Sequence, residues 1–102
     1  MKYEIEEWNS RTVFIFKNHI KTFQEFTEII DKLIQPDHKS EVEITSWTEA
    51  FIFKKDEIEI YFQNFYTDDS WFSFELYPFE KQNKSDLKKL KNLMDQLSAY
   101  SF

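Results

Sequence analysis

EIEIYFQ at residues 57–63 and WFSFELY at residues 71–77 place an apolar residue at every second position. Successive side chains of a strand point to opposite faces of a sheet, so each segment predicts a strand with one apolar face. A polar break at residues 66–70 separates the two segments. A connection this short predicts that the two strands are antiparallel neighbours.

Working outward, four more segments have the composition of strands. Residues 41–46 and 49–54 precede the central pair, and the polar pair Lys55-Asp56 separates the second of them from residues 57–63. Residues 3–8 and 12–17 predict an N-terminal hairpin, because the link at 9–11 is short. The second hairpin strand is apolar on both faces, which is typical of a central strand.

Two helices complete the prediction. Thr22-Phe23-Gln24-Glu25 matches the capping box, and the helix that it begins should end before Pro36. A second helix, capped by Ser85, follows the last strand and carries one apolar stripe. We therefore expect a single α+β domain over residues 1–102, with a largely antiparallel sheet of about six strands in the order β-β-α-β-β-β-β-α. Both helices should pack on one face of that sheet.

Splitting the four later strands by parity predicts two different faces. The first set is entirely apolar and should form the core under the helices: Val42, Ile44, Ala50, Ile52, Ile58, Ile60, Phe62, Phe72, Phe74 and Leu76. The second set mixes acids with large rings: Glu41, Glu43, Thr45, Trp47, Glu49, Phe51, Phe53, Glu57, Glu59, Tyr61, Gln63, Trp71, Ser73, Glu75 and Tyr77. Aromatic rings gathered on a solvent-facing surface indicate a contact surface.

This acidic-aromatic face is the predicted binding site. Trp and Tyr are enriched among the residues that dominate binding energy, and acids around them select basic partners. The candidate partner-binding residues are Glu43, Trp47, Glu59, Tyr61, Trp71, Glu75 and Tyr77. Three alternatives remain open. The rings stabilise the sheet by cross-strand pairing, they are covered by another part of the chain, or they form a homodimer contact.

Composition excludes several classes of function. The chain has no cysteine and no glycine, so thiolate metal sites, disulfides and glycine-rich phosphate loops are absent. The net charge of −6 disfavours nucleic acid as a ligand and favours basic partners. The apolar runs are too short to span a membrane, and no secretory signal precedes the first strand. We expect a cytoplasmic location.

No catalytic or metal motif emerges from the remaining polar residues. His19 and His38 flank the first helix without an acid or a nucleophile at motif spacing. Asp68-Asp69 lacks the spaced oxygen ligands of a calcium loop. We expect no catalytic residue, no metal and no cofactor. The lysine-rich face of the second helix is consistent with binding of phosphate or an acidic partner, and equally with a solvated helix face.

In size, acidity, lack of motifs and mixed α+β order, the chain resembles small bacterial immunity proteins. That resemblance implies stoichiometric binding of a cognate toxin, with an acidic surface meeting a basic enzyme. Under this hypothesis Trp47, Tyr61 and Trp71 anchor the partner, while the three glutamates of the candidate set pair with its lysines or arginines. Two other hypotheses are a small-molecule-binding domain or enzyme with a pocket between sheet and helices, and a structural homodimer subunit.

Overall fold

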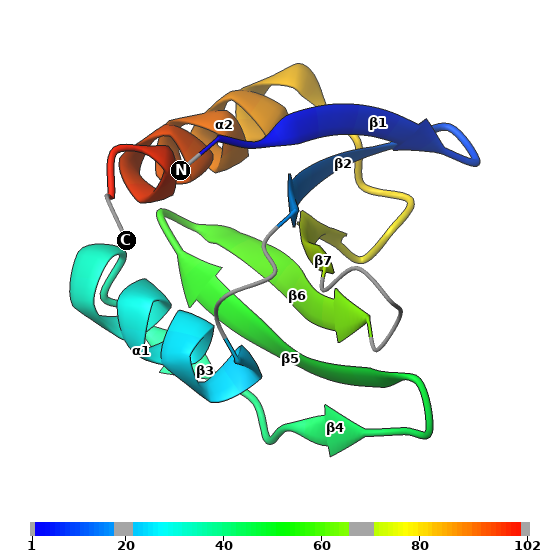
Figure 1. The fold of residues 1–102 in the computed structure, drawn as a ribbon. Helices are drawn as coiled ribbons and strands as arrows, with labels where there is room; N and C mark the ends of the chain where they lie inside the picture. Colours follow the sequence, from blue (N-terminus) through cyan, green and yellow to red (C-terminus); the bar gives the residue numbers. More distant parts are fainter. Residues whose placement is uncertain (1, 18–21, 66–70, 101–102) are drawn as a thin grey trace.

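The structure is a computed structural model that describes residues 2–17, 22–65 and 71–100. It is an α+β fold with one antiparallel sheet, whose strand order is β1-β2-β7-β6-β5-β3, with β4 also paired to β5 (Figure 1). The strands are β1 (Glu4–Trp8), β2 (Arg11–Lys17), β3 (His38–Lys39), β4 (Glu43–Ile44), β5 (Thr48–Lys55), β6 (Ile58–Phe65) and β7 (Trp71–Tyr77). The helices are α1 (Phe23–Leu33) and α2 (Lys84–Ser98).

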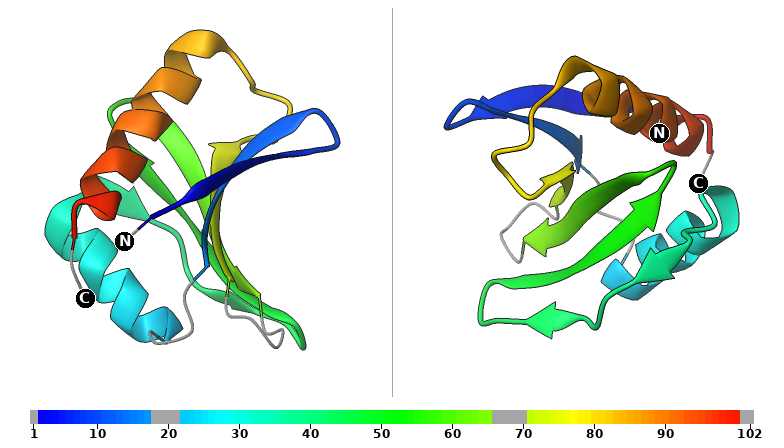
Figure 2. Two further views of the ribbon diagram at one scale, coloured as in Figure 1. Left: turned by 45° about the horizontal axis from the view of Figure 1, so that its top comes forward. Right: turned by 180° about the vertical axis from the view of Figure 1, so that it is seen from behind.

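Both helices lie on the same face of the sheet, as predicted (Figure 2). We call the opposite face the outer face. None of the helices in the described ranges is long and apolar enough to cross a membrane.

The helix termini follow from local hydrogen bonds. The Thr22 hydroxyl accepts from the Glu25 amide, and the Glu25 carboxylate accepts from the Thr22 amide, which confirms the predicted capping box. Helix α2 begins two residues earlier than predicted, because Asn83 and not Ser85 is the cap. The side-chain oxygen of Asn83, Oδ1, accepts from the Asp86 amide at 2.9 Å.

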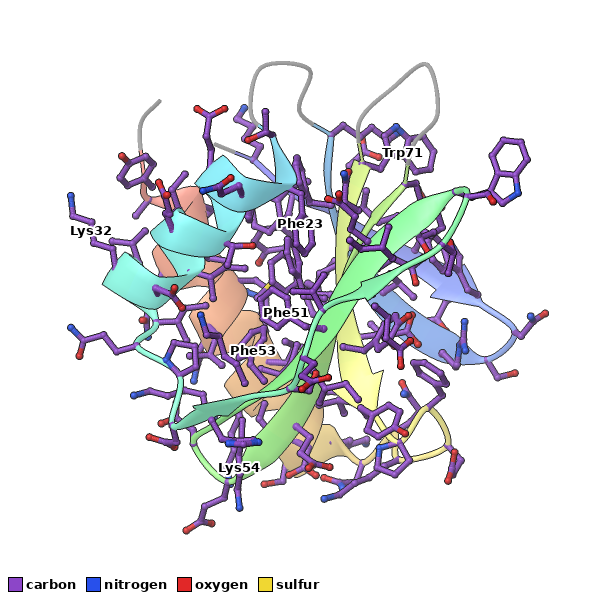
Figure 3. The ribbon with its side chains drawn as sticks, turned by 90° about the horizontal axis from the view of Figure 1, so that it is seen from below. Phe23, Lys32, Phe51, Phe53, Lys54 and Trp71 are labelled. Carbon is purple, nitrogen blue, oxygen red and sulfur yellow. The ribbon has the colours of Figure 1, made fainter. Side chains whose placement is uncertain are left out.

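The core between the helices and the sheet is built from phenylalanine rings. Phe26 of α1 stacks on Phe72 at 4.3 Å between ring centroids and also contacts Phe62 at 5.6 Å. Phe23 packs edge-on against Phe51 at 5.9 Å. Figure 3 shows Phe23 and Phe51 pointing into the space between α1 and the sheet. Rings in such contact leave this space filled with the chain's own side chains.

The predicted faces of β5 are wrong by one residue. Phe51 and Phe53 point into the core and are 3% and 0% exposed, whereas Ala50 and Ile52 lie on the outer face. The register explains this assignment, because Phe51 pairs with Phe62 and residues directly opposite share a face. Both parities of β5 are apolar, so alternation alone could not distinguish them. The core beneath α1 accommodates the larger rings.

The predicted strand at 41–46 is reduced to the two residues of β4, and a further short strand, β3, that the sequence analysis does not predict precedes it. His38 pairs with Lys54 and Lys39 with Phe53, but further on Glu43 pairs with Ala50. From Lys39 to Glu43 the edge strand advances four residues, while its partner β5 advances only three, from Ala50 to Phe53. The edge strand therefore contains one extra residue between β3 and β4. This is a β-bulge, which bends an edge strand and increases its twist.

Val42 and Ile44 were predicted to lie in the core, and this is also wrong. By register, Ile44 shares the helix-side face with its partner Glu49. Val42 and Ile44 are nevertheless 47% and 71% exposed. In Figure 1, β4 lies at the periphery of the sheet, away from α1. The side chains have the predicted direction, but no helix in the described structure covers them.

Candidate functional site

Most of the predicted binding residues share the outer face but differ in exposure. Glu43 and Glu59 are exposed, and Trp71 and the two tyrosines are half-buried. Glu75 is only 4% exposed. Trp47 lies apart from them, in the turn between β4 and β5, and is 72% exposed. The outer face is therefore not the open aromatic surface that the sequence predicts.

The rings on the outer face are covered by nearby side chains of the same chain. Phe79, which follows β7, packs edge-on against Tyr61 at 5.2 Å and against Tyr77 at 5.4 Å. The guanidinium of Arg11 lies 4.7 Å from the centre of the Phe79 ring. Sequence reasoning missed Phe79 and Arg11, because neither belongs to the parity sets of the later strands.

The N-terminal hairpin contributes to the same cover. Trp8 at the end of β1 contacts Phe65 at the end of β6, with ring centroids 5.9 Å apart. Lys17 places its ammonium 4.7 Å from the centre of the Trp71 ring, which lies on the outer side of the sheet in Figure 3. These contacts support the alternative that the chain covers much of its own aromatic face.

Beneath this cover the buried Glu75 pairs with the partly buried Arg11. The Arg11 Nε atom is 3.4 Å from Glu75 Oε1, and neither atom has a hydrogen-bond partner among the described residues. Burial raises the pKa of Glu75, and the charge of Arg11 partly offsets this effect. Burial, followed by the charges of Glu43 and Glu75, also raises the pKa of Tyr61. The pair joins the hairpin to β7.

The exposed apolar surface lies instead at the edge of the sheet. The exposed large apolar residues in the described ranges are Ile5, Val42, Ile44 and Trp47. Three of them, Val42, Ile44 and Trp47, fall within six residues of one another. Val42 and Ile44 alternate with Glu41 and Glu43, which are also exposed. We call these five residues, Glu41, Val42, Glu43, Ile44 and Trp47, the β4 edge patch.

Hydrogen bonds hold the turn that carries Trp47. The Thr45 hydroxyl accepts from the amide of Trp47 at 3.2 Å and from the amide of Thr48 at 3.0 Å. The Thr45 amide in turn donates to the Thr48 carbonyl at 2.8 Å. A ring on a preformed turn loses little conformational entropy when a partner covers it. The sequence signal for this turn is Thr45-Ser46, a pair that favours side-chain-to-backbone bonds.

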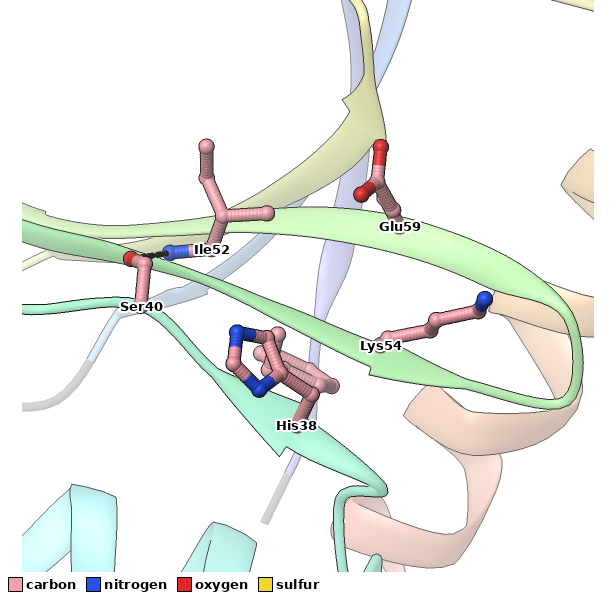
Figure 4. A pocket seen from close by; sticks show the side chains of 6 residues that line it. His38, Ser40, Ile52, Lys54 and Glu59 are labelled. Atoms are coloured by element: carbon pink, nitrogen blue, oxygen red, sulfur yellow. Dashed lines mark hydrogen bonds between the residues drawn. The ribbon is translucent and has the colours of Figure 1, made fainter.

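A hollow of about 410 Å³ lies on the edge of the sheet beside β3 (Figure 4). It is lined by His38, Ser40, Ile52, Phe53, Lys54 and Glu59. The Ser40 hydroxyl accepts from the Ile52 amide at 2.9 Å and donates to the Glu41 carbonyl. It therefore satisfies backbone groups at the β-bulge. This hollow is not the predicted pocket between the sheet and the helices.

Within the described residues, the remaining polar side chains form no group suited to a metal ion. No group of three or more His, Asp or Glu side chains in residues 2–17, 22–65 and 71–100 could hold a metal ion. His19 and Asp68-Asp69, named in the sequence analysis, lie outside the described residues. Comparison of the chain with protein-family models, with curated proteins and with solved structures found no match.

Proposed function

We propose that the chain is a non-catalytic protein-binding module that holds a basic partner through the β4 edge patch. One observation carries this proposal: Ile44 and Trp47 are 71% and 72% exposed on a short edge strand and its hydrogen-bonded turn. Large apolar residues in this position are costly in water and are typical of contact surfaces.

The apolar residues provide most of the expected affinity. Burying a large apolar side chain completely contributes about 1.5–3 kcal/mol. Because Ile44 and Trp47 are each exposed by more than two thirds, covering them contributes about 1–2 kcal/mol apiece. An exposed ion pair contributes about 0–1 kcal/mol. The glutamates of the patch therefore select the partner and accelerate its encounter, while the apolar side chains hold it.

The predicted site residues have different roles in this proposal. Trp47 is the anchor of the partner, and Glu43 is the acidic residue of β4 that selects basic partners. The charge of Glu43 acts on Tyr61, and Glu59 is exposed on the same face beside Lys54 of β5. Trp71, Glu75 and Tyr77 are covered by side chains of the same chain. Lys17 lies over Trp71, Arg11 pairs with Glu75, and Phe79 packs against Tyr77.

An inhibitor of a basic toxin, as in an immunity protein, is the most concrete form of this function. The net charge of −6 supports it, because a surface rich in carboxylates attracts a basic enzyme over long range. The preformed turn supports it as well, since tight inhibitors bind with little rearrangement.

The test measures binding of a purified partner, captured first from a lysate of the source cells. The double variant Ile44→Ser/Trp47→Ser should weaken binding by about 30-fold or more, the loss of about 2–4 kcal/mol. Ile5→Ser is the matched control, because Ile5 is 51% exposed on β1, at the opposite edge of the sheet. Unchanged affinity in the double variant, or an equal loss in the control, would contradict the proposal.

A further inference from the structure

We infer that the partner docks as an extended antiparallel strand on the free edge of β4, with basic and apolar residues alternating along it. This inference rests on the proposed binding function and adds the mode of recognition and the side-chain pattern of the partner.

The backbone of β4 has the geometry that an added strand requires. The Thr45 amide donates to the Thr48 carbonyl, so Thr45 turns its backbone groups toward β5. In an antiparallel pair, alternate residues turn their backbone groups toward the partner strand and the residues between them turn away. Ile44 therefore presents its amide and carbonyl outward, away from β5. An edge with such groups is a template for another strand.

The side chains of the patch define the sequence of the added strand. Residues directly opposite one another share a face of the sheet, and opposite charges or apolar pairs on one face stabilise the pairing. Glu43 lies on the outer face with Ala50, and Ile44 lies on the helix-side face with Glu49. The added strand should therefore place a lysine or arginine beside Glu43 and an apolar residue beside Ile44.

Charge also excludes a second copy of this chain as the favoured occupant. An antiparallel copy would bring the glutamates at 41 and 43 close to the same glutamates of its partner, and like charges on paired strands are destabilising. Edge strands are commonly protected from pairing by lysine or proline. On this edge the charged residues around the two exposed aliphatic side chains are acidic, so they repel acidic strands and admit basic ones.

The experiment uses a synthetic peptide of sequence KVKVKVK with blocked ends, and KKVVVKK as a control of the same composition. Binding to the full chain is followed by the amide signals of β4 in nuclear magnetic resonance. KVKVKVK should bind about ten-fold or more tightly than the control and should slow hydrogen exchange at the Ile44 amide. Equal binding of the two peptides, or no binding of KVKVKVK at millimolar concentration, would overturn the inference.

Methylation of peptide nitrogens tests the strand geometry directly. The residue opposite Ile44 exchanges backbone hydrogen bonds with it, and this residue is a valine in the proposed register. Methylating the valine nitrogens should abolish binding, whereas methylating the lysine nitrogens, which point to solvent, should not. Binding that survives valine methylation but is lost in Ile44→Ser/Trp47→Ser would overturn strand addition and leave the proposed binding surface intact.

Discussion

At two turns of this chain, residues other than glycine adopt the positive φ values that glycine usually provides. Asn9 and Ser10 connect β1 to β2 with φ values of 52° and 65°, and Asp56 and Glu57 connect β5 to β6 with 52° and 67°. Two successive residues with positive φ define the type I′ turn, which matches the twist of a hairpin. The sequence predicts turns with positive φ at Asn9, Asp56 and Asn64, since these residue types tolerate it. This is wrong for Asn64, which lies within β6. Nothing about Ser10 or Glu57 as residue types predicts the same conformation.

Ser10→Gly should stabilise the protein. The left-handed conformation costs a residue with a Cβ atom about 1–2 kcal/mol, and glycine avoids this at the expense of greater freedom in the unfolded chain. We expect a net gain of about 0.5–1 kcal/mol in the free energy of unfolding, measured by urea denaturation. Ser10→Ala keeps the Cβ atom and should give no gain. A loss of stability in Ser10→Gly would contradict the turn geometry.

The buried Glu75 predicts a particular dependence of stability on pH. Because its pKa is raised in the folded state, the folded chain holds a proton that the unfolded chain has released. The contribution of Glu75 is therefore most favourable below about pH 4, where both states are protonated, and becomes unfavourable as the pH rises through the folded pKa.

Glu75→Gln should remove this part of the pH dependence. Between pH 4 and pH 8 the free energy of unfolding of the variant should fall less steeply with rising pH than that of the unchanged protein. Hydrogen bonds lower the pKa values of Asp86 and Asp95, so both proteins should share a loss of stability at more acidic pH. Identical slopes above pH 4 would show that Glu75 ionises normally in the folded state.

Helices and strands differ in how well the sequence predicts them. The capping box of α1 and the alternation of β6 and β7 are local signals, and the structure confirms them. The face of β5 could not be predicted, because Ala50 and Ile52 are as apolar as Phe51 and Phe53, and only packing against Phe23 and Phe62 decides between the pairs. The bulge before β4 depends on pairing with β5 and has no glycine to mark it.

Asn83→Ala should destabilise α2, whereas Ser85→Ala should not. Asn83 accepts from the Asp86 amide and donates to the Asp86 carboxylate, each at 2.9 Å. Loss of a cap costs about 1 kcal/mol. Ser85 lies within the first turn of the helix, so its removal should change the free energy of unfolding by less than about 0.5 kcal/mol. Thermal unfolding of the two variants decides between Asn83 and Ser85 as the cap.

At the scale of the whole molecule, one face of the sheet packs against the two helices, and the other is partly covered by side chains of the same chain. The candidate binding residues on the outer face were correctly placed together by parity, but their cover by Phe79 and Arg11 depends on the path of the chain after β7 and around the hairpin. The patch that remains exposed is at the edge. Val42 and Ile44 have the direction that alternation predicts, and they stay exposed because neither described helix covers them.

Truncating a ring in the core should lower the free energy of unfolding far more than truncating the ring at the edge. Phe53 is 0% exposed and Trp47 is 72% exposed. Phe53→Ala should lower the free energy of unfolding by about 3–5 kcal/mol through loss of burial and creation of a cavity. Trp47→Ala should change it by less than about 0.5 kcal/mol. Chemical denaturation measures both, and a large loss in Trp47→Ala would mean that this ring is covered.

The three tryptophans provide the most direct test of where a partner docks, because Trp8, Trp47 and Trp71 lie on β1, in the β4–β5 turn and on β7. Each gives a separate indole N–H signal in nuclear magnetic resonance. When the purified partner is added to the labelled protein, the signal of Trp47 should shift strongly while those of Trp8 and Trp71 stay near their free positions. Strong shifts at Trp8 and Trp71 with an unmoved Trp47 would place the partner on the outer face and contradict docking at the edge.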